Sequence, residues 1–273
     1  MATLNLDRSA AGATTGNTVA FGTLAIGAQT LNVTGANGYK ARINGATTLT
    51  GDATIDTNTT VLLAGAINGA FGLTKTGTGH LAVNGTSNTA STLVTAGSFG
   101  GTGTLVFSLR ANVGATLAPG NGGPGILAVG TDLTLDTGST FSLNISKSGA
   151  TPVAGTDYDR VTVGTGGVLS STGTVSLDGS LIDLTIGTGI QFNDRFFVII
   201  NDGADPIIGT FGNAPGGVVS FSGQTFQVIY TADSTSNQIS GGNDLLLIAV
   251  PEPGSFLLAL LSGAGILGRR RRR

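Results

Sequence analysis

The chain contains no cysteine and no tryptophan, and it has only one methionine, one histidine and one glutamate among its 273 residues. Without cysteine it can form neither a disulfide framework, nor a zinc-thiolate site, nor a thiolate nucleophile. A serine nucleophile would need a histidine partner, and His80 lies inside a repetitive segment. We interpret His80 as a polar surface residue at a strand edge. The sequence therefore offers little for thiol or triad chemistry.

Charge is also scarce, because charged residues make up 10% of the chain. Without the five C-terminal arginines and Glu252, eight basic residues face fourteen aspartates, a net charge of −6. This balance argues against a nucleic-acid partner. The glycine-rich residues 120–125 lack the helix and the Gly-Lys-Ser/Thr of a phosphate loop, and the calcium pattern Gly-Gly-x-Gly-x-Asp is missing. We expect no metal and no cofactor.

The composition is instead that of an all-β protein, because good helix formers are rare before residue 250 while Thr, Val, Ile and Gly recur. The 46 glycines and 7 prolines stay below the roughly 25–30% share that is typical of disorder. Short period-two runs bounded by Gly, Asn or Asp predict strands at residues 23–26, 30–33, 60–63, 81–83 and 104–107. Such spacing fits a sandwich or a solenoid, and the degenerate similarity between runs favours the solenoid.

Residues 72–85, GLTKTGTGHLAVNG, resemble the autotransporter-associated β-strand repeat, in which two strands and a glycine turn mark one coil of a β-helix. Residues 101–105 and 115–121 are similar to segments that commonly follow this repeat in secreted bacterial proteins. These segments lie within residues 72–121, which are about a fifth of the chain. The resemblance implies a right-handed parallel β-helix, which we assign to residues 1–149.

After Ile145 the apolar runs lengthen and phenylalanines concentrate, which predicts a thicker core. Strands are expected at residues 158–163, 194–199, 209–211, 226–230 and 243–248. We interpret residues 150–249 as final coils and a β-rich cap, because an open coil end exposes unpaired strand edges. A separate β-sandwich over the same residues is the alternative.

The last 24 residues combine a Val-Pro-Glu-Pro motif, an apolar stretch and five arginines. The two prolines keep the motif extended and outside any helix that follows. Residues 254–268 would form a helix about 22 Å long, against a hydrocarbon core of roughly 30 Å. The arginines resist translocation, so the C-terminus is expected in the cytoplasm and the body on the other side of the membrane.

This order of features closely resembles the PEP-CTERM sorting signal of bacterial surface and matrix proteins, which implies recognition and removal by a membrane-embedded exosortase. An ordinary single-pass anchor is the alternative. The resemblance gives the tail three parts: the sorting motif Val250, Pro251, Glu252 and Pro253; the membrane segment, with Gly254, Phe256, Leu257, Leu258, Leu260, Leu261, Ile266 and Leu267; and the cytoplasmic anchor Arg269, Arg270, Arg271, Arg272 and Arg273.

The first residues lack the charged flank and the apolar run of a secretory signal. Because a sorting tail without export has no use, we expect that the start of this sequence is truncated or misassigned. We therefore expect the genomic sequence to encode an in-frame signal peptide upstream of Met1.

These features predict a non-enzymatic structural or adhesive protein that passes through an inner-membrane intermediate to the cell surface or extracellular matrix. Its expected partners are an exosortase, the membrane before processing, and exopolysaccharide, to which threonine and asparagine side chains offer hydrogen bonds. The competing hypothesis is a carbohydrate-active β-helix enzyme, a lyase or hydrolase, with paired carboxylates as acid and base. Its candidates are Asp157, Asp159, Asp202 and Asp205, all beside residues that favour turns. An autotransporter passenger is disfavoured, since the C-terminus lacks amphipathic barrel strands.

Overall fold

The computed structural model describes residues 1–7, 15–164, 173–201 and 205–251. Strands dominate this part of the chain, and the one helical segment in it is the short 3-10 turn η1, Pro215–Gly217. None of its helices is long and apolar enough to cross a membrane. The expected C-terminal helix, the five arginines, Glu252 and Pro253 lie outside the described residues. The all-β class is confirmed.

Most strands belong to three sheets whose members pair in parallel with the strand one coil away. The first sheet contains β1 (Ala2–Leu6), β4 (Thr30–Gly35), β7 (Ala53–Thr57), β10 (Gly72–Thr76), β13 (Ser91–Val94), β16 (Ser108–Ala111), β19 (Leu133–Leu135) and β22 (Val175–Ser176). The second contains β2 (Thr18–Phe21), β5 (Lys40–Ile43), β8 (Thr60–Leu63), β11 (His80–Val83), β14 (Gly97–Gly101), β17 (Ala115–Pro119), β20 (Thr140–Ile145) and β23 (Leu181–Ile186).

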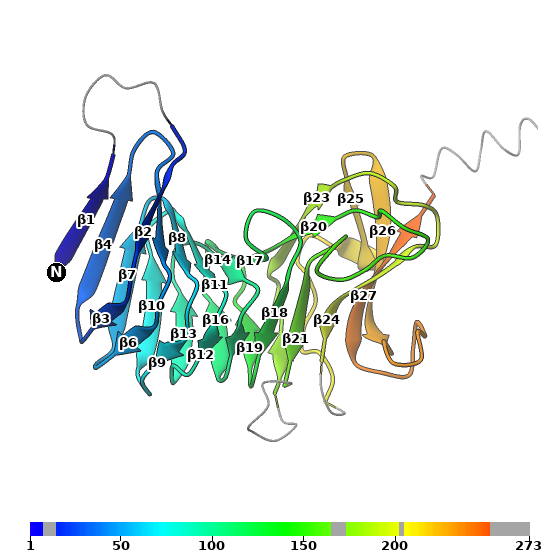
Figure 1. The fold of residues 1–273 in the computed structure, drawn as a ribbon. Coiled ribbons are helices and arrows are strands. Elements are labelled where there is room, and N and C mark those ends of the chain that lie inside the picture. Colours follow the sequence, from blue (N-terminus) through cyan, green and yellow to red (C-terminus); the bar gives the residue numbers. More distant parts are fainter. Residues whose placement is uncertain (8–14, 165–172, 202–204, 252–273) are drawn as a thin grey trace, which may run out of the picture.

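The third sheet begins with β3 (Leu24–Ile26), β6 (Thr47–Leu49), β9 (Ile67–Asn68), β12 (Thr86–Ser87), β15 (Thr104–Leu105), β18 (Ile126–Val129), β21 (Arg160–Val163) and β24 (Arg195–Ile200). The chain therefore visits the three sheets in turn, and successive coils stack into an elongated body (Figure 1). This arrangement is consistent with the predicted solenoid. The five strands expected before residue 110 are found as β3, β4, β8, β11 and β15.

The coils stack because inward-facing side chains form continuous columns through the interior. In the second sheet one such column, read from the strand register, is Val19, Ala41, Val61, Leu81, Phe99, Leu117, Phe141 and Ile182. From Ala41 onward each of its members is nearly inaccessible to solvent. Because apolar and polar residues alternate along the sequence, the apolar side chains of a strand share one face, and that face packs into the core.

A column of glycines occupies the corner between the second and third sheets. Its members are Gly22, Gly45, Gly65, Gly85 and Gly103. A Cβ on Gly65 would lie 2.3 Å from the carbonyl oxygen of Gly45, and the same spacing recurs from Gly85 to Gly65 and from Gly103 to Gly85. The corner accepts only glycine at these three positions, because the backbone of one coil rests directly on that of the next.

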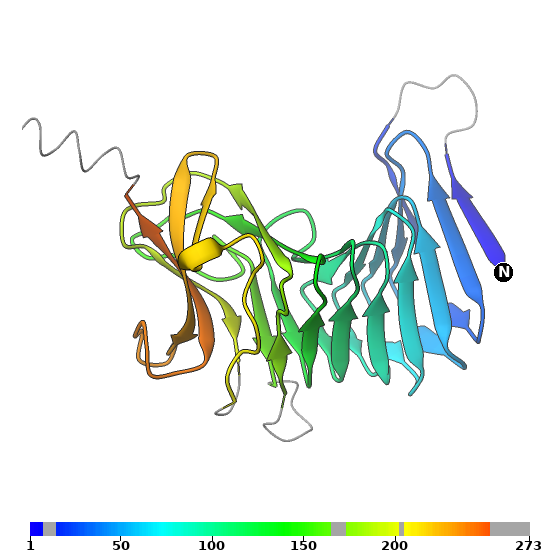
Figure 2. The same ribbon diagram turned by 180° about the vertical axis from the view of Figure 1, so that it is seen from behind.

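At the C-terminal end the third sheet changes from parallel to antiparallel pairing (Figure 2). Strand β24 pairs with β27 (Asp244–Val250), which pairs with β26 (Gln224–Ala232), and β25 (Val218–Phe221) forms the edge. The main buried cluster runs without interruption from the coils into these strands. Phe196 makes edge-to-face ring contacts with Tyr158 and Phe226, at centroid distances of 5.3 and 6.0 Å.

One of the strands expected in this region is absent. Residues 209–211 form no strand, although those expected around residues 158–163, 194–199, 226–230 and 243–248 are found as β21, β24, β26 and β27. The Phe211 ring stacks on Phe141, and its backbone N–H donates to the Tyr230 hydroxyl at 3.1 Å. Phe211 is therefore buried although it lies in a loop, and the alternation of apolar and polar residues near residue 210 does not indicate a strand.

Candidate ligand-binding cleft

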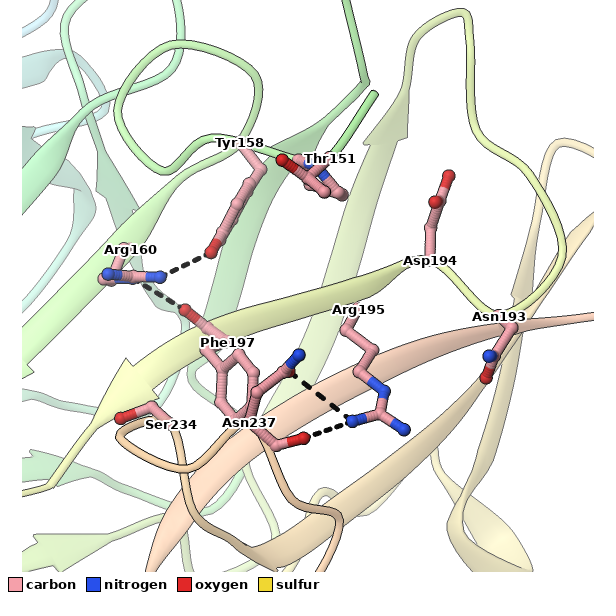
Figure 3. A pocket seen from close by; sticks show the side chains of 10 residues that line it. Thr151, Tyr158, Arg160, Asn193, Asp194, Arg195, Phe197, Ser234 and Asn237 are labelled. Carbon is pink, nitrogen blue, oxygen red and sulfur yellow. Dashed lines mark hydrogen bonds between the residues drawn. The ribbon is translucent and has the colours of Figure 1, made fainter. Parts of the chain in front are cut away.

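A cleft of about 530 Å³ lies where the start of strands β21 and β24 meets the turn between β26 and β27 (Figure 3). Arg160 and Arg195 are the first residues of those two strands, and each is followed by a fully buried residue, Val161 or Phe196. Strand alternation therefore turns both arginines away from the main core. The floor of the cleft includes Phe197, which belongs to a smaller apolar cluster on the opposite side of the sheet from Phe196.

Arg160 is held rigidly by its neighbours. Its Nε donates to the Phe197 carbonyl oxygen at 2.9 Å, and its Nη2 donates to the Tyr158 hydroxyl. The guanidinium carbon also lies 5.5 Å from the centre of the Tyr158 ring, within the range of a cation-π interaction. Burial raises the pKa of Tyr158, with Arg160 acting in the opposite direction, so the phenol stays protonated and neutral at neutral pH.

Arg195 reaches the other side of the cleft. Its Nη1 donates to the backbone carbonyl of Asn237 and, at 3.5 Å, approaches the side-chain oxygen of the same residue. The acidic neighbour Asp194 is engaged elsewhere, because its carboxylate lies 2.7 Å from the Lys147 ammonium and accepts the backbone N–H of Gln191. The cleft thus combines two guanidinium groups with amide and hydroxyl side chains.

The first two residues of the sequence-predicted sorting motif, Val250 and Pro251, lie at the end of strand β27 and do not line this cleft. Val250 is the final residue of β27 and pairs with Thr225, and Pro251 is exposed directly after it. Because proline has no N–H to donate, the ladder ends at this position. Glu252 and Pro253, the membrane segment from Gly254 to Leu267 and the anchor Arg269 to Arg273 lie outside the described residues.

Two of the aspartates considered for a sugar-active enzyme, Asp157 and Asp159, bind neighbouring loops through their carboxylates. Asp157 is buried, and its carboxylate accepts from the Ser148 backbone and hydroxyl and from the Val153 N–H, which lowers its pKa. Asp159 is also buried and accepts N–H groups of Gly125 and Asn144 at 2.7–2.8 Å. Both carboxylates tie loops together, as aspartates in turns commonly do.

Two further candidates complete that set. Asp205 contributes its backbone carbonyl, which accepts from the side chains of Asn201 and Asn243. Asp202 lies outside the described residues. None of the described residues forms a cluster of three or more histidine, cysteine or carboxylate groups that would suit a metal ion.

His80 is half-buried on the outer side of the second sheet, which corrects the prediction of a plain surface position. Its Nδ1 lies 2.9 Å from the Ser98 hydroxyl, and it lines a shallow pocket with Pro119, Gly120 and Asn144. The segment after β17 lines the same pocket, and strand patterning gives no signal of such a loop. Burial, and secondarily the charge of Lys75, lowers the pKa of His80 to about 4.

We expect replacement of His80 by glutamine to make the fold more resistant to acid. The unfolded chain protonates His80 near pH 6.5, whereas the fold keeps it neutral down to about pH 4, so acid favours unfolding in that window. Urea unfolding at pH 7.0 and 4.5 should show that His80→Gln loses about 1–2 kcal/mol less stability than wild type on acidification. An identical loss in both proteins would contradict the assignment.

Asp159 also contributes to the change in the free energy of unfolding between pH 7.0 and 4.5. Burial raises the pKa of Asp159 to about 6, despite its N–H donors, from 3.8 in the unfolded chain. Between these values the folded state binds the extra proton, so this carboxyl stabilises the fold as the pH falls, opposite to His80. Since Asp159 is retained in both proteins, their difference isolates the histidine.

No protein-family model matches the chain, and a search of curated proteins returns no match.

Proposed function

We propose that this chain is an exported structural or adhesive protein of the bacterial surface or extracellular matrix, whose right-handed β-helical body contacts exopolysaccharide. In this proposal residues 1–149 form the repeat region, residues 150–249 the final coils and cap, and residues 250–273 a PEP-CTERM sorting signal with a short membrane helix. An exosortase removes that tail. The body acts through its surface and needs no reactive residue.

The observation that carries the proposal is the polar outer surface of the stacked coils. Strand register brings one outward side chain per coil into line, at the ~4.8 Å spacing of paired strands. In the first sheet one such row is Thr30, Thr54, Thr74, Leu93, Arg110, Thr134 and Ser176. Five of these seven side chains carry hydroxyl groups, which offer repeated hydrogen bonds to a polysaccharide.

The position of the tail supports processing without loss of the fold. Strand β27 is paired on both sides, by β24 and β26, and its register with β26 runs to Val250. Pro251 follows as an exposed residue after the last pair. Cleavage beyond Val250 therefore removes none of the strands that the structure describes, and a protease can reach the exposed Pro251 without unfolding the body.

The proposal is tested by replacing both prolines of the motif, Pro251→Ala with Pro253→Ala, in the bacterium that makes the protein. We expect the variant to accumulate in the membrane fraction while wild type appears outside the cell, because the alanine motif no longer presents an extended, helix-excluded substrate. Pro215→Ala is a matched control, since Pro215 is an exposed proline of the body. Equal release of the double variant and wild type would contradict exosortase sorting.

A further inference from the structure

The cleft at β21 and β24 contains two arginines, Arg160 and Arg195, that form no ion pair with any described residue. The ion pairs among the described residues are Arg110 with Asp136 and Lys147 with Asp194. Arg160 and Arg195 therefore have no acidic partner in that part of the chain. In a body with a net charge of −6, two unpaired guanidinium groups in one cleft create a local positive site.

Arg195 lines the cleft, and one edge of its guanidinium has no hydrogen-bond partner among the described residues. Its Nη1 is used by Asn237, whereas its Nε and Nη2 donate to no group within the described residues. These two nitrogens form the side-on fork of a guanidinium, which matches the two oxygens of a carboxylate in a bidentate pair. The contact with Asn237 fixes the orientation of this fork before any ligand arrives, which lowers the entropic cost of binding.

The neighbouring acid does not occupy that fork. Lys147 binds the Asp194 carboxylate at 2.7 Å, and both side chains are almost buried, with 5% and 11% exposed. Figure 3 shows the Asp194 carboxylate directed away from the Arg195 guanidinium. Lys147 thus compensates the one carboxylate that lines the cleft and leaves the positive charge of Arg195 for a ligand.

We propose that this cleft binds the carboxylate of an acidic saccharide, such as a uronate unit within a polysaccharide, through Nε and Nη2 of Arg195. Arg160 adds a second positive charge, and the side chains of Thr151, Asn193 and Ser234, which line the same cleft, suit sugar hydroxyls because they both donate and accept hydrogen bonds. The inference rests on the proposed matrix function for its source of polysaccharide.

An acidic peptide fits the cleft less well. Strand β21 is paired with β18 and β24, and β24 is paired with β21 and β27, so neither strand that lines the cleft offers a free edge. A peptide would therefore be unable to add its backbone as a strand. A saccharide does not depend on such an edge, since its hydroxyl and carboxylate groups bind side chains directly.

The test uses the full chain in non-ionic detergent and isothermal titration calorimetry at low salt, with tetragalacturonate as the probe. We expect the methyl-esterified tetramer to bind at least tenfold more weakly, and Arg195→Gln to weaken tetragalacturonate binding at least tenfold. The matched control Arg42→Gln removes an exposed arginine on the second sheet, outside the cleft and outside the hydroxyl row of the first sheet, and should leave binding unchanged. Arg195→Lys keeps the charge without the fork and should bind with intermediate affinity.

Several results would overturn the proposal: no binding of tetragalacturonate, equal binding of its ester, equal loss in the Arg42 control, or equally tight binding of tetraglutamate. If Arg195→Gln does not fold, unchanged binding by Arg195→Lys would overturn it as well. Failure here is distinguishable from failure of the proposed function. If the proline substitutions abolish release but the cleft does not bind tetragalacturonate, the sorting function is supported and this site is not. If the cleft binds tetragalacturonate specifically but the protein is not processed, this site is supported and the sorting function is not.

Discussion

Replacement of Gly65 by alanine is expected to destabilise the fold by about 3 kcal/mol. The new methyl group would lie 2.3 Å from the Gly45 carbonyl oxygen and 2.6 Å from its carbon, so one coil would have to move away from the next. Because the obstacle is backbone, no side-chain rotation relieves it. Urea unfolding followed by circular dichroism measures the loss.

The same column supplies the control. Gly22 occupies its N-terminal position, and a Cβ there would meet nothing within 4 Å. Gly22→Ala should change the free energy of unfolding by no more than about 0.5 kcal/mol. Losses of equal size at Gly65 and Gly22 would show that these glycines serve chain flexibility, and not the close approach of stacked coils.

Replacement of Lys75 by methionine is expected to destabilise the fold by about 2 kcal/mol at pH 7. Lys75 is fully buried in an inward column, beside Ile55 and Val94. Its Nζ donates to the carbonyl oxygens of Thr76, Gly77 and Ala96 at 2.6, 2.8 and 3.2 Å. Methionine has a similar length and no donors, so the three carbonyls would lose their partner. Lys40→Met, an exposed lysine on β5, is the matched control.

The pH dependence of this effect has a definite sign. Burial lowers the pKa of Lys75 to about 8, although the charge of Asp56 acts in the opposite direction. Between pH 8 and 10.5 the unfolded chain holds a proton that the fold has released, so wild-type stability rises with pH in that window. The difference between wild type and Lys75→Met should therefore grow from pH 8 to 10. A constant difference would contradict a buried, titrating ammonium.

The sequence predicts the coils well because their physics is local. Each strand of a coil alternates buried and exposed residues, and each corner needs glycine or a short polar side chain, so residues 23–107 already contain the pattern of the strands found there. The glycine column has a readable signal too, since Gly45, Gly65, Gly85 and Gly103 each precede a strand of the third sheet by one or two residues.

Other features depend on contacts between distant segments, which no local pattern contains. The cleft is built by Arg160, Arg195 and Asn237, which the fold brings together from two coils and a hairpin turn. Phe211 is buried by a loop, and Lys75 occupies an apolar column because three backbone carbonyls accept its hydrogen bonds. The alternation of apolar and polar residues therefore fails to predict a buried charge such as Lys75 and a buried aromatic residue outside the strands such as Phe211.

The central claim, an exported body released from its C-terminal tail, is tested most directly by mass spectrometry of the intact protein collected from outside the cell. The account predicts a mature C-terminus close to Val250, after the last residue paired in β27. It also predicts that this processed protein unfolds at the same urea concentration as the full chain, since every strand of the described residues lies before Pro251. An extracellular or membrane-bound protein that still ends at Arg273 would contradict the claim.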